Sequence, residues 1–260
     1  MHQKAVISPE RLSARPRDRG ADVARGDARR LARKITDELG VAIAKGEYLS
    51  GEPLTGSVVA QRFGVSRGLA CEAINSLVRR RLARRDDHRR ALVVGLSLET
   101  FIDLFNSRAL LLALATRHFA RAGTAVDKSS LRAAVVDLAR YAEAAQCDPI
   151  KFAESTGALG RLIYRNCGSP ALSKLISHQV DGSAWGTLWR QVPLDYTGLA
   201  RRREAATIYG EISDAIQRRD ANAAERLMRS ALMRSRAAAV ASLSQAKLSA
   251  ADDRKALMRA

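Results

Sequence analysis

The chain has 260 residues, and its 47% of apolar and 27% of charged residues are ordinary for a folded protein with a hydrophobic core. It carries 44 Lys and Arg against 27 Asp and Glu, a formal charge of +17. This surplus predicts an anionic partner, usually nucleic acid, with a merely solvated basic surface as the alternative. The longest strongly apolar stretch, residues 110–115, is far shorter than the roughly 20 residues of a transmembrane helix.

Cysteine usage and the N-terminal pattern bear on the compartment. The three cysteines form no CxxC pair and suggest no disulfide framework. The charged N-terminal segment is not followed by the apolar region of a secretory signal. We therefore expect a cytoplasmic protein with reduced thiols.

The pattern at the start of the chain predicts a tail followed by a helix. Residues 1–26 contain prolines, glycines and scattered arginines without a sustained apolar period, which predicts a basic disordered tail. From residue 28 to residue 45, apolar residues recur with a helical period. Gly46 and Pro53 are expected to end this helix.

Two shorter helices and a hairpin are expected next. Ser57 is a candidate N-cap for a short helix that ends near Phe63, and Ser66 is a candidate N-cap for a helix over residues 67–82. Charged residues 84–90 then separate two short extended pieces, which predicts a hairpin with a basic tip. Two helices joined by a tight turn and followed by such a hairpin are typical of a winged helix-turn-helix.

Beyond residue 96 the pattern is helical almost throughout, beginning with a helix over residues 98–121 that Ser97 caps. We predict a mostly α protein with an N-terminal winged helix-turn-helix at 27–96, an all-helical bundle domain at 97–246 and a C-terminal tail at 247–260. Further helices are expected at 128–147, 149–166, 170–189, 199–218 and 221–246.

The winged arrangement itself suggests DNA-binding residues. The second helix of such a pair lies in the major groove with its N-terminal residues at base edges. Ser66, Arg67 and Gly68 occupy that N-terminus, where free amide groups favour a phosphate. Arg67 could bind a guanine edge through two hydrogen bonds, and Gly68 lets the backbone come close. The hairpin tip could place further residues beside the minor groove or the phosphates: His88, Arg89 and Arg90.

The N-terminal segment contains IAKGEY at 43–48, GEPL at 51–54, AQRFGVSR at 60–67 and EAI at 72–74. The helical segment contains LSLE at 96–99, GSPAL at 168–172 and ISDAI at 212–216. The first set resembles the DNA-binding domain of the GntR family of transcriptional regulators, and the second resembles the FCD-type effector domain of its FadR-like subgroup. Together the resemblance spans about residues 28–240.

The resemblance implies a sequence-specific DNA-binding regulator that acts as a homodimer on a pseudo-palindromic operator, most often as a repressor released by a metabolite. It also adds candidate DNA contacts. Arg62 lies within the matching motif, and Ser57 stands where relatives often have a basic DNA contact. Cys71 replaces the basic residue that usually precedes the glutamate at position 72, which removes one phosphate contact.

The effector domain departs further from the family pattern. Many FadR-like domains hold a divalent metal with one Asp and three His, and the corresponding positions here are Thr156, Gly160, Tyr209 and Ala231. None of these is an ordinary ligand of Zn²⁺ or Ni²⁺, so we expect neither a metal nor any other cofactor. Replacing His by Gly and Ala should enlarge the cavity, which would then suit a small organic acid or acyl effector.

The remaining effector candidates are basic or hydroxylated. Arg108 matches an arginine that faces the effector in relatives, although an interdomain salt bridge is an equal alternative. Near Gly160 lie Arg161, Tyr164 and Arg165, which could line the pocket, and Tyr209 could donate a hydrogen bond where relatives hold the metal.

No Gly-rich phosphate loop, nucleophile elbow or HExxH motif occurs, so we do not expect an enzyme. Two rival functions remain open. The first is a ligand-independent DNA-binding dimer, and the second is a metal-dependent sensor or enzyme.

Overall fold

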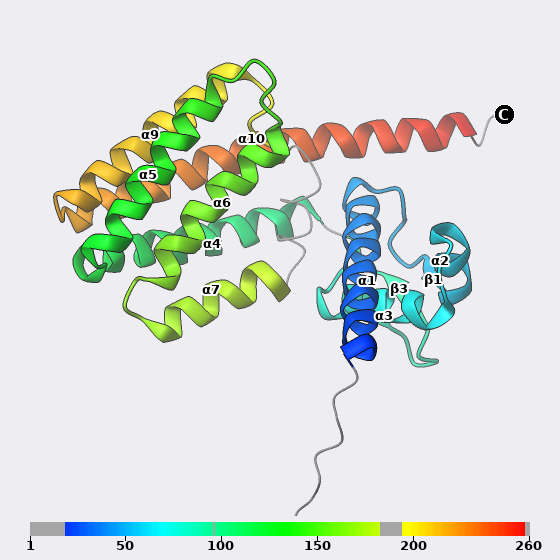
Figure 1. The fold of residues 1–260 in the computed structure, drawn as a ribbon. Coiled ribbons are helices and arrows are strands. Elements are labelled where there is room, and N and C mark those ends of the chain that lie inside the picture. The colour runs from blue at the N-terminus through cyan, green and yellow to red at the C-terminus, as the bar shows by residue number, and fades with distance from the viewer. Residues whose placement is uncertain (1–18, 96, 183–193, 258–260) are drawn as a thin grey trace, which may run out of the picture.

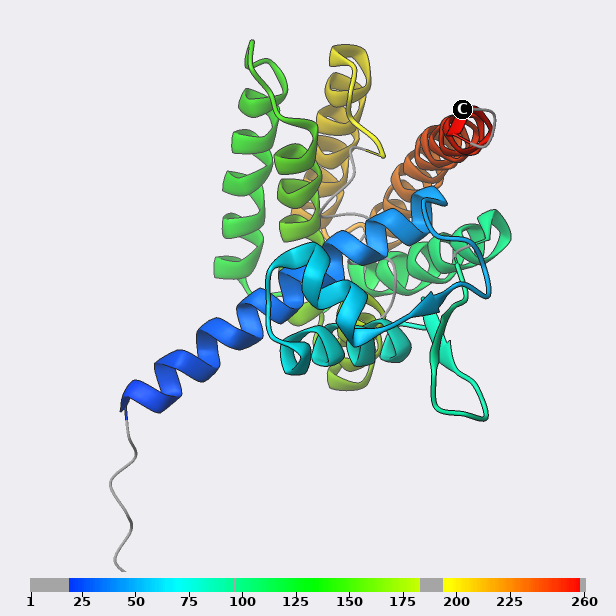
Figure 2. The same cartoon turned by 90° about the vertical axis from the view of Figure 1, so that its right-hand side faces the viewer.

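The computed structural model describes residues 19–95, 97–182 and 194–257. The predicted fold class is confirmed: the described chain is mostly helical, with a small sheet near its N-terminal end. The N-terminal elements pack into one unit, and a bundle of longer helices lies beside it (Figure 1). The last helix crosses the bundle and continues past it, beside the first helix of the N-terminal unit (Figures 1 and 2).

The N-terminal unit is a winged helix-turn-helix. Its elements in chain order are α1 (Arg19–Lys45), β1 (Pro53–Leu54), α2 (Gly56–Phe63), α3 (Arg67–Arg79), β2 (Ala83–Arg85) and β3 (Ala91–Val93). The strands form an antiparallel sheet in the order β1-β3-β2, with Leu54 opposite Ala91 and Ala83 opposite Val93. Gly64 turns the chain between α2 and α3 in the left-handed conformation, φ +63°, which glycine adopts at little cost.

The first helix begins earlier than the sequence pattern predicts. Residues 1–26 were expected to form a disordered tail, yet α1 begins at Arg19. After Pro16 the chain has no proline until Pro53, and its Arg and Ala residues favour a helix, so the helix extends toward the N-terminus. Residues 1–18 lie outside the described residues.

The helix-turn-helix boundaries also differ from expectation. Thr55 rather than Ser57 is the N-cap of α2, because its backbone is extended and its hydroxyl accepts a hydrogen bond from the Val58 amide at 3.3 Å. Helix α3 ends at Arg79 rather than near Leu82, since Arg81 has a positive φ of 61° that α-helix does not allow. The edge strand β1 was not predicted, because a two-residue strand that begins with proline has no period to detect.

The second unit consists of α4 (Leu98–Ala122), α5 (Ala125–Ala142), α6 (Pro149–Arg165), α7 (Pro170–Gly182), α9 (Leu199–Gln217) and α10 (Ala221–Leu257). Side-chain caps explain three of the starts: Ser97, Thr124 and Asp148 each accept a hydrogen bond from a first-turn amide. Thr124 starts α5 earlier than predicted. Residues 183–189 of the predicted helix 170–189 lie outside the described residues.

The C-terminal segment 247–260 was expected to be a frayed tail, but α10 runs on to Leu257. Its sequence after residue 246 contains no proline or glycine, so nothing ends the helix there. No helix within the described ranges is long and apolar enough to cross a membrane.

The hydrophobic cores do not divide at the predicted boundary near residue 96. One core lies inside the helical bundle. The other, which we call the junction core, joins winged-helix residues such as Leu39 and Leu77 to Phe101 and Phe105 of α4. It also contains Leu194 and two residues of α10, Ala239 and Leu243. Helices α4 and α10 therefore contribute to both cores.

Candidate functional site

The N-terminus of α3 is presented to solvent. Ser66 is its N-cap as predicted, with a hydroxyl that accepts a hydrogen bond from the Leu69 amide at 3.3 Å. The opposite face of α3 is buried through Ala70, Ala73, Ile74 and Leu77. Arg67 and Gly68 are exposed on the open face. This arrangement offers free amide groups, a positive helix end and a guanidinium to an anionic partner.

The tip of the wing between β2 and β3 is organised by one carboxylate. Asp86 accepts hydrogen bonds from the backbone amides of His88 and Arg90, and from the Arg90 Nε at 2.8 Å. Desolvation raises the pKa of this carboxyl, but these bonds and the Arg90 charge outweigh it and hold the pKa below its ordinary value. His88, Arg89 and Arg90 remain exposed on the tip.

Arg85 on β2 braces the wing against α3, and the sequence pattern did not single it out. Its guanidinium donates to the Asn75 side-chain oxygen at 2.6 Å and to the Arg89 carbonyl at 2.5 Å. The wing tip and the exposed face of α3 are thus fixed relative to each other. The run of arginines around position 85 gave no signal that this one differs from its neighbours.

The two predicted DNA contacts on α2 are Arg62 and Ser57, and the side chain of Arg62 contacts neighbouring side chains. The Arg62 guanidinium lies over the rings of Tyr48 and Phe63 at 5.5 and 5.7 Å and donates to the Tyr48 hydroxyl. It also lies 3.9 Å from a Glu47 oxygen. Arg62 therefore holds the loop before β1 while staying half-exposed. Ser57 is exposed in the first turn of α2.

Cys71 has a packing role that explains its small size. A Cβ built on Gly56 would lie 2.8 Å from the Cys71 Sγ, so no side chain fits at Gly56 unless the two helices separate. Cys71 and Gly56 therefore allow α2 and α3 to approach closely.

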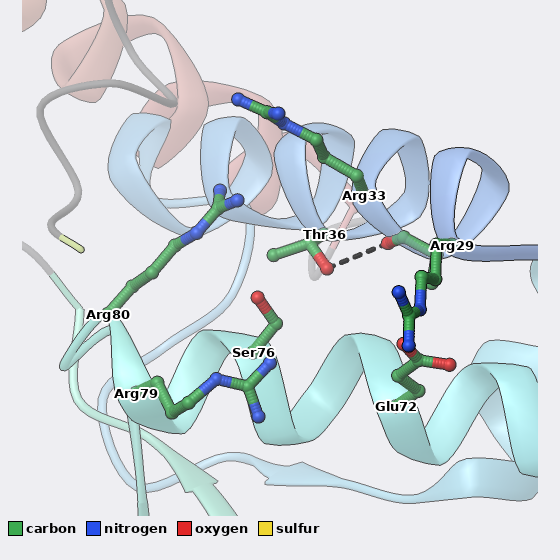
Figure 3. A pocket seen from close by; sticks show the side chains of 8 residues that line it. Arg29, Arg33, Thr36, Glu72, Ser76, Arg79 and Arg80 are labelled. Carbon is green, nitrogen blue, oxygen red and sulfur yellow. Dashed lines mark hydrogen bonds between the residues drawn. The ribbon is translucent and has the colours of Figure 1, made fainter. Parts of the chain in front are cut away.

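A basic groove lies between α1 and α3 (Figure 3). It has a volume of about 340 Å³ and is lined by Arg29, Ala32, Arg33, Thr36, Glu72, Ser76, Arg79 and Arg80. The floor is buried and fixed: Arg80 is bound to Asp37 at 2.5 Å, and the Thr36 hydroxyl donates to the Ala32 carbonyl at 2.8 Å. The arginines at its rim, Arg29, Arg33 and Arg79, are exposed. The groove has no signature in the sequence, because its two walls come from helices that are distant in the chain.

In the helical unit, most of the predicted effector residues are buried. Thr156, Gly160 and Tyr164 lie on the buried face of α6, with Arg108 of α4 and Tyr209 of α9 also buried. Ala231 is buried on α10. Arg161 and Arg165 are exposed on α6. The structure thus separates two of the predicted arginines from the buried residues.

The expected enlargement of the cavity at Gly160 does not occur. A Cβ built there would lie 3.3 Å from a Leu112 methyl and 3.7 Å from the Arg108 Nη2. The side chains of α4 thus fill the space that a histidine would take. Burial lowers the pKa of Arg108, while the nearby tyrosines 209 and 164 oppose that shift.

The residues at the family's metal positions do not fit a divalent cation. Burial raises the pKa of the Tyr209 hydroxyl well above its ordinary range, so this phenol stays neutral and is a poor ligand. The Arg108 guanidinium beside Gly160 would also repel a cation. Across the part of the chain that the structure describes, no group of three His, Cys, Asp or Glu side chains could hold a metal ion.

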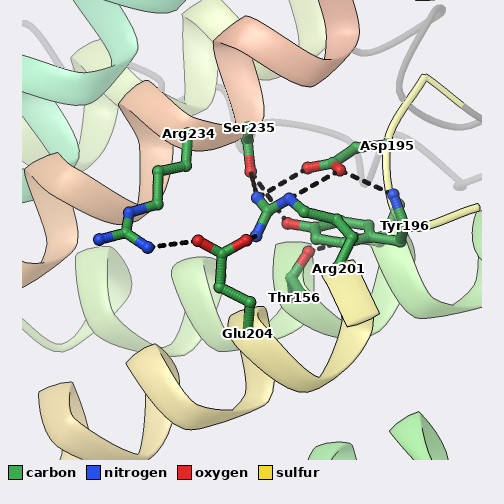
Figure 4. Close-up of polar contacts among 8 residues, drawn as sticks. Thr156, Asp195, Tyr196, Arg201, Glu204, Arg234 and Ser235 are labelled. Carbon is green, nitrogen blue, oxygen red and sulfur yellow. Dashed lines mark hydrogen bonds and ion pairs between the residues drawn. The ribbon is translucent and has the colours of Figure 1, made fainter. Parts of the chain in front are cut away.

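A polar network next to this cluster was not predicted (Figure 4). Arg201 of α9 donates to both Asp195 oxygens at 3.1 and 3.0 Å, to Ser235 of α10 at 3.1 Å and to Glu204 at 3.0 Å. Its guanidinium lies 5.2 Å from the centre of the Tyr196 ring. We call these residues the Arg201 network. Only the spacing of Arg201 and Glu204 was visible in the sequence.

The Arg201 network borders an open cavity of about 800 Å³ between residues 194–201 and α10. Asp195, Tyr196 and Arg201 line it on one side, and Ser242 and Gln245 of α10 line it on the other. The lining of this cavity also includes Leu194, a residue of the junction core.

Comparisons with known proteins identify two families in the chain. Residues 31–93 match the domain described as bacterial regulatory proteins, gntR family, and residues 103–234 match the FCD domain. No curated protein matches the chain. The matches cover the winged helix and most of the helical bundle.

Solved structures with a similar fold include two that match most of this chain and most of their own. One is E. coli McbR/YncC, with a TM-score of 0.56, 17% identity, and coverage of 83% of this chain and 97% of that chain. The other is Lar, which controls the expression of the Listeria monocytogenes agr system and mediates virulence; its TM-score is 0.62, with 15% identity and coverage of 80% and 95%. At these identities the likeness concerns the fold alone.

Proposed function

The chain belongs to the GntR family of bacterial regulatory proteins with an FCD domain, and from this premise we propose a metabolite-responsive repressor that binds a pseudo-palindromic operator as a homodimer. The observation that carries the DNA-binding part is the exposed N-terminus of α3, with Arg67 and Gly68 open beside a wing that Arg85 fixes. Assignment to the FadR-like subgroup stays a prediction.

In this proposal α3 lies in the major groove. Arg67 reads a base edge, most readily guanine, whose two acceptors match the guanidinium fork. Ser66 and the amides of the first turn bind a phosphate, and the wing residues Arg89 and Arg90 bind phosphates or the minor groove. Two copies of the chain would place two such helices on successive turns of the duplex.

The route from the helical domain to the DNA-binding domain is also part of the proposal. Helix α4 carries Phe105 in the junction core and Arg108 in the buried cluster, one turn apart. Helix α10 carries Ser235 in the Arg201 network and Ala239 in the junction core. An effector that moves α4 or α10 would therefore shift the support of the winged helix and change operator affinity.

We predict that Arg67→Ala weakens operator binding by about 1–3 kcal/mol, the usual loss for a base-reading arginine. The operator would first be selected from random-sequence duplexes with the wild-type protein, and affinities would then be compared by gel shift. Arg132→Ala, an exposed arginine on α5, is the matched control. Equal affinities for Arg67→Ala and the control would refute the role of Arg67.

The effector is proposed to be a small organic acid or acyl compound that pairs with an arginine. The packing of Arg108 and Leu112 against Gly160 favours a second candidate, a ligand-independent DNA-binding dimer. A thermal-shift screen with a panel of organic acids separates the two. A ligand that raises the melting temperature and alters operator affinity supports the first, and no shift with any compound supports the second.

We also predict that removal of divalent metal has no effect. Neutral Tyr209 and the Arg108 charge leave no suitable ligand set at the family's metal positions. Treatment with a chelator should leave the melting temperature and operator affinity unchanged. A chelator-induced drop in melting temperature that added Zn²⁺ or Ni²⁺ restores would contradict this and favour the metal-dependent sensor.

A further inference from the structure

We infer that the basic groove between α1 and α3 binds a phosphate of the DNA backbone, so that α1 adds a second phosphate-binding surface beside the recognition helix. This inference rests on the proposed DNA-binding function and extends it to a helix outside the helix-turn-helix and the wing.

The groove lies on the side of α3 that borders its open face. Glu72, Ser76 and Arg79 follow an i, i+4, i+7 spacing and therefore lie along one side of the helix. That side adjoins the open face that carries Arg67 and Gly68. When the open face of a recognition helix enters the major groove, its sides face the phosphates that border the groove. The groove thus opens where a DNA strand would pass.

The rim of the groove is mostly basic. Arg29 on α1 points across the groove toward Glu72 on α3, whereas Arg33 extends from the α1 rim away from α3 (Figure 3). Ser76 and Arg79 line the α3 wall of the groove. A guanidinium can donate two parallel hydrogen bonds to a phosphate, so exposed arginines on both walls suit a bound phosphodiester. Glu72 is the opposing charge at the rim, and the arginines outnumber it.

The floor of the groove is held by bonds within the protein. Arg80 is bound to Asp37, and the Thr36 hydroxyl is bound to the α1 backbone, so neither needs to rearrange when a ligand enters. The α3 wall of the groove extends from Glu72 to Arg79, and both of these residues are exposed, so the groove adjoins the exposed face of α3 over two turns of the helix. These features favour duplex DNA over a free phosphate compound.

The test compares two pairs of substitutions on α1. Arg29→Ala with Arg33→Ala, the groove pair, removes the two arginines that α1 contributes to the groove. Arg30→Ala with Lys34→Ala removes the same charge from the same helix, about 100° further round its axis, where these residues pair with Asp27 and Glu38 instead. Binding to a mixed-sequence duplex is measured by fluorescence anisotropy over a series of KCl concentrations, with circular dichroism as the check of folding.

Each phosphate contact contributes about 0.9 to the slope of log affinity against log salt. Loss of the one phosphate bound in the groove should therefore make the slope shallower by about one for the groove pair, and the control pair should change it by clearly less. Equal changes for both pairs would overturn the inference while leaving the proposed function intact. Absence of salt-dependent DNA binding by the wild-type protein would instead refute the proposed function itself.

A thermal shift with inorganic phosphate tests the free-anion alternative. If phosphate stabilises the wild-type protein and not the groove pair, while both give the same salt slope, the groove binds a small anion and the assignment to DNA is wrong. If the salt slope of the groove pair becomes shallower as expected, and the groove pair also loses the phosphate-induced thermal shift, both results agree with a site for a backbone phosphate.

Discussion

Arg201→Ala should lower the free energy of unfolding by about 3–5 kcal/mol, the usual cost of leaving one member of a buried ion pair without its partner. The Asp195 side chain is fully buried, and that of Arg201 is only 19% exposed. Arg201 is also the residue that joins Asp195 to Ser235 of α10 and Glu204 of α9. Urea denaturation monitored by far-ultraviolet circular dichroism measures the change.

The pH dependence of stability distinguishes two causes of destabilisation in Arg201→Ala, namely the unpaired charge of Asp195 and the loss of packing. Burial raises the pKa of Asp195 above its ordinary value of 3.8, against the opposing charge of Arg201. Because the folded state then binds a proton more tightly than the unfolded state, Asp195 favours folding at low pH, and this contribution is lost as pH rises through its folded pKa. Without Arg201 that pKa rises further, so the deficit of Arg201→Ala should shrink on acidification.

Asp195→Asn combined with Arg201→Ala is the control. The amide removes the buried charge, so the double variant should be more stable than Arg201→Ala alone at neutral pH. If the double variant is less stable than the single one, and the deficit does not depend on pH, the ion pair is not what holds this network together.

The winged helix could be predicted from the sequence because the patterns that indicate it are local. The Ser66 cap, the glycine turn at 64 and the basic hairpin all depend on residues within a few positions of one another. The same locality explains the errors. The Thr55 cap and the Ser57 prediction differ by two residues, and the choice between them depends on the backbone conformation before α2 rather than on residue type.

The helical unit was predictable in its elements but not in its interior. Family positions identified Thr156, Gly160 and Tyr209, all of which are buried. They did not reveal that Arg108 and Leu112 fill the space beside Gly160, because that packing depends on how α4 lies against α6. The Arg201 network and the groove between α1 and α3 were missed for the same reason: each joins residues from distant parts of the chain.

Phe105→Ala should also destabilise the protein by about 3–5 kcal/mol, as expected for emptying a fully buried aromatic site. Phe105 is completely buried and packs edge to face on Phe101, with ring centres 5.2 Å apart. Both rings belong to the junction core, together with Leu194 and Leu243. The cavity would therefore loosen the support of the winged helix by α4 and α10, and we expect weaker operator binding even at temperatures where the variant is folded.

Phe119→Ala is the matched control, because Phe119 is as deeply buried on the same helix but lies in the bundle core. It should cost about the same 3–5 kcal/mol in urea denaturation while leaving operator affinity near the wild-type value. Two results would contradict this: wild-type operator affinity in Phe105→Ala, or an equal loss of affinity in Phe119→Ala. Either would show that the junction core does not couple the helical domain to the DNA-binding helix. Loss of affinity in Phe105→Ala alone would assign that path to α4, which carries Phe105 and Arg108 one turn apart.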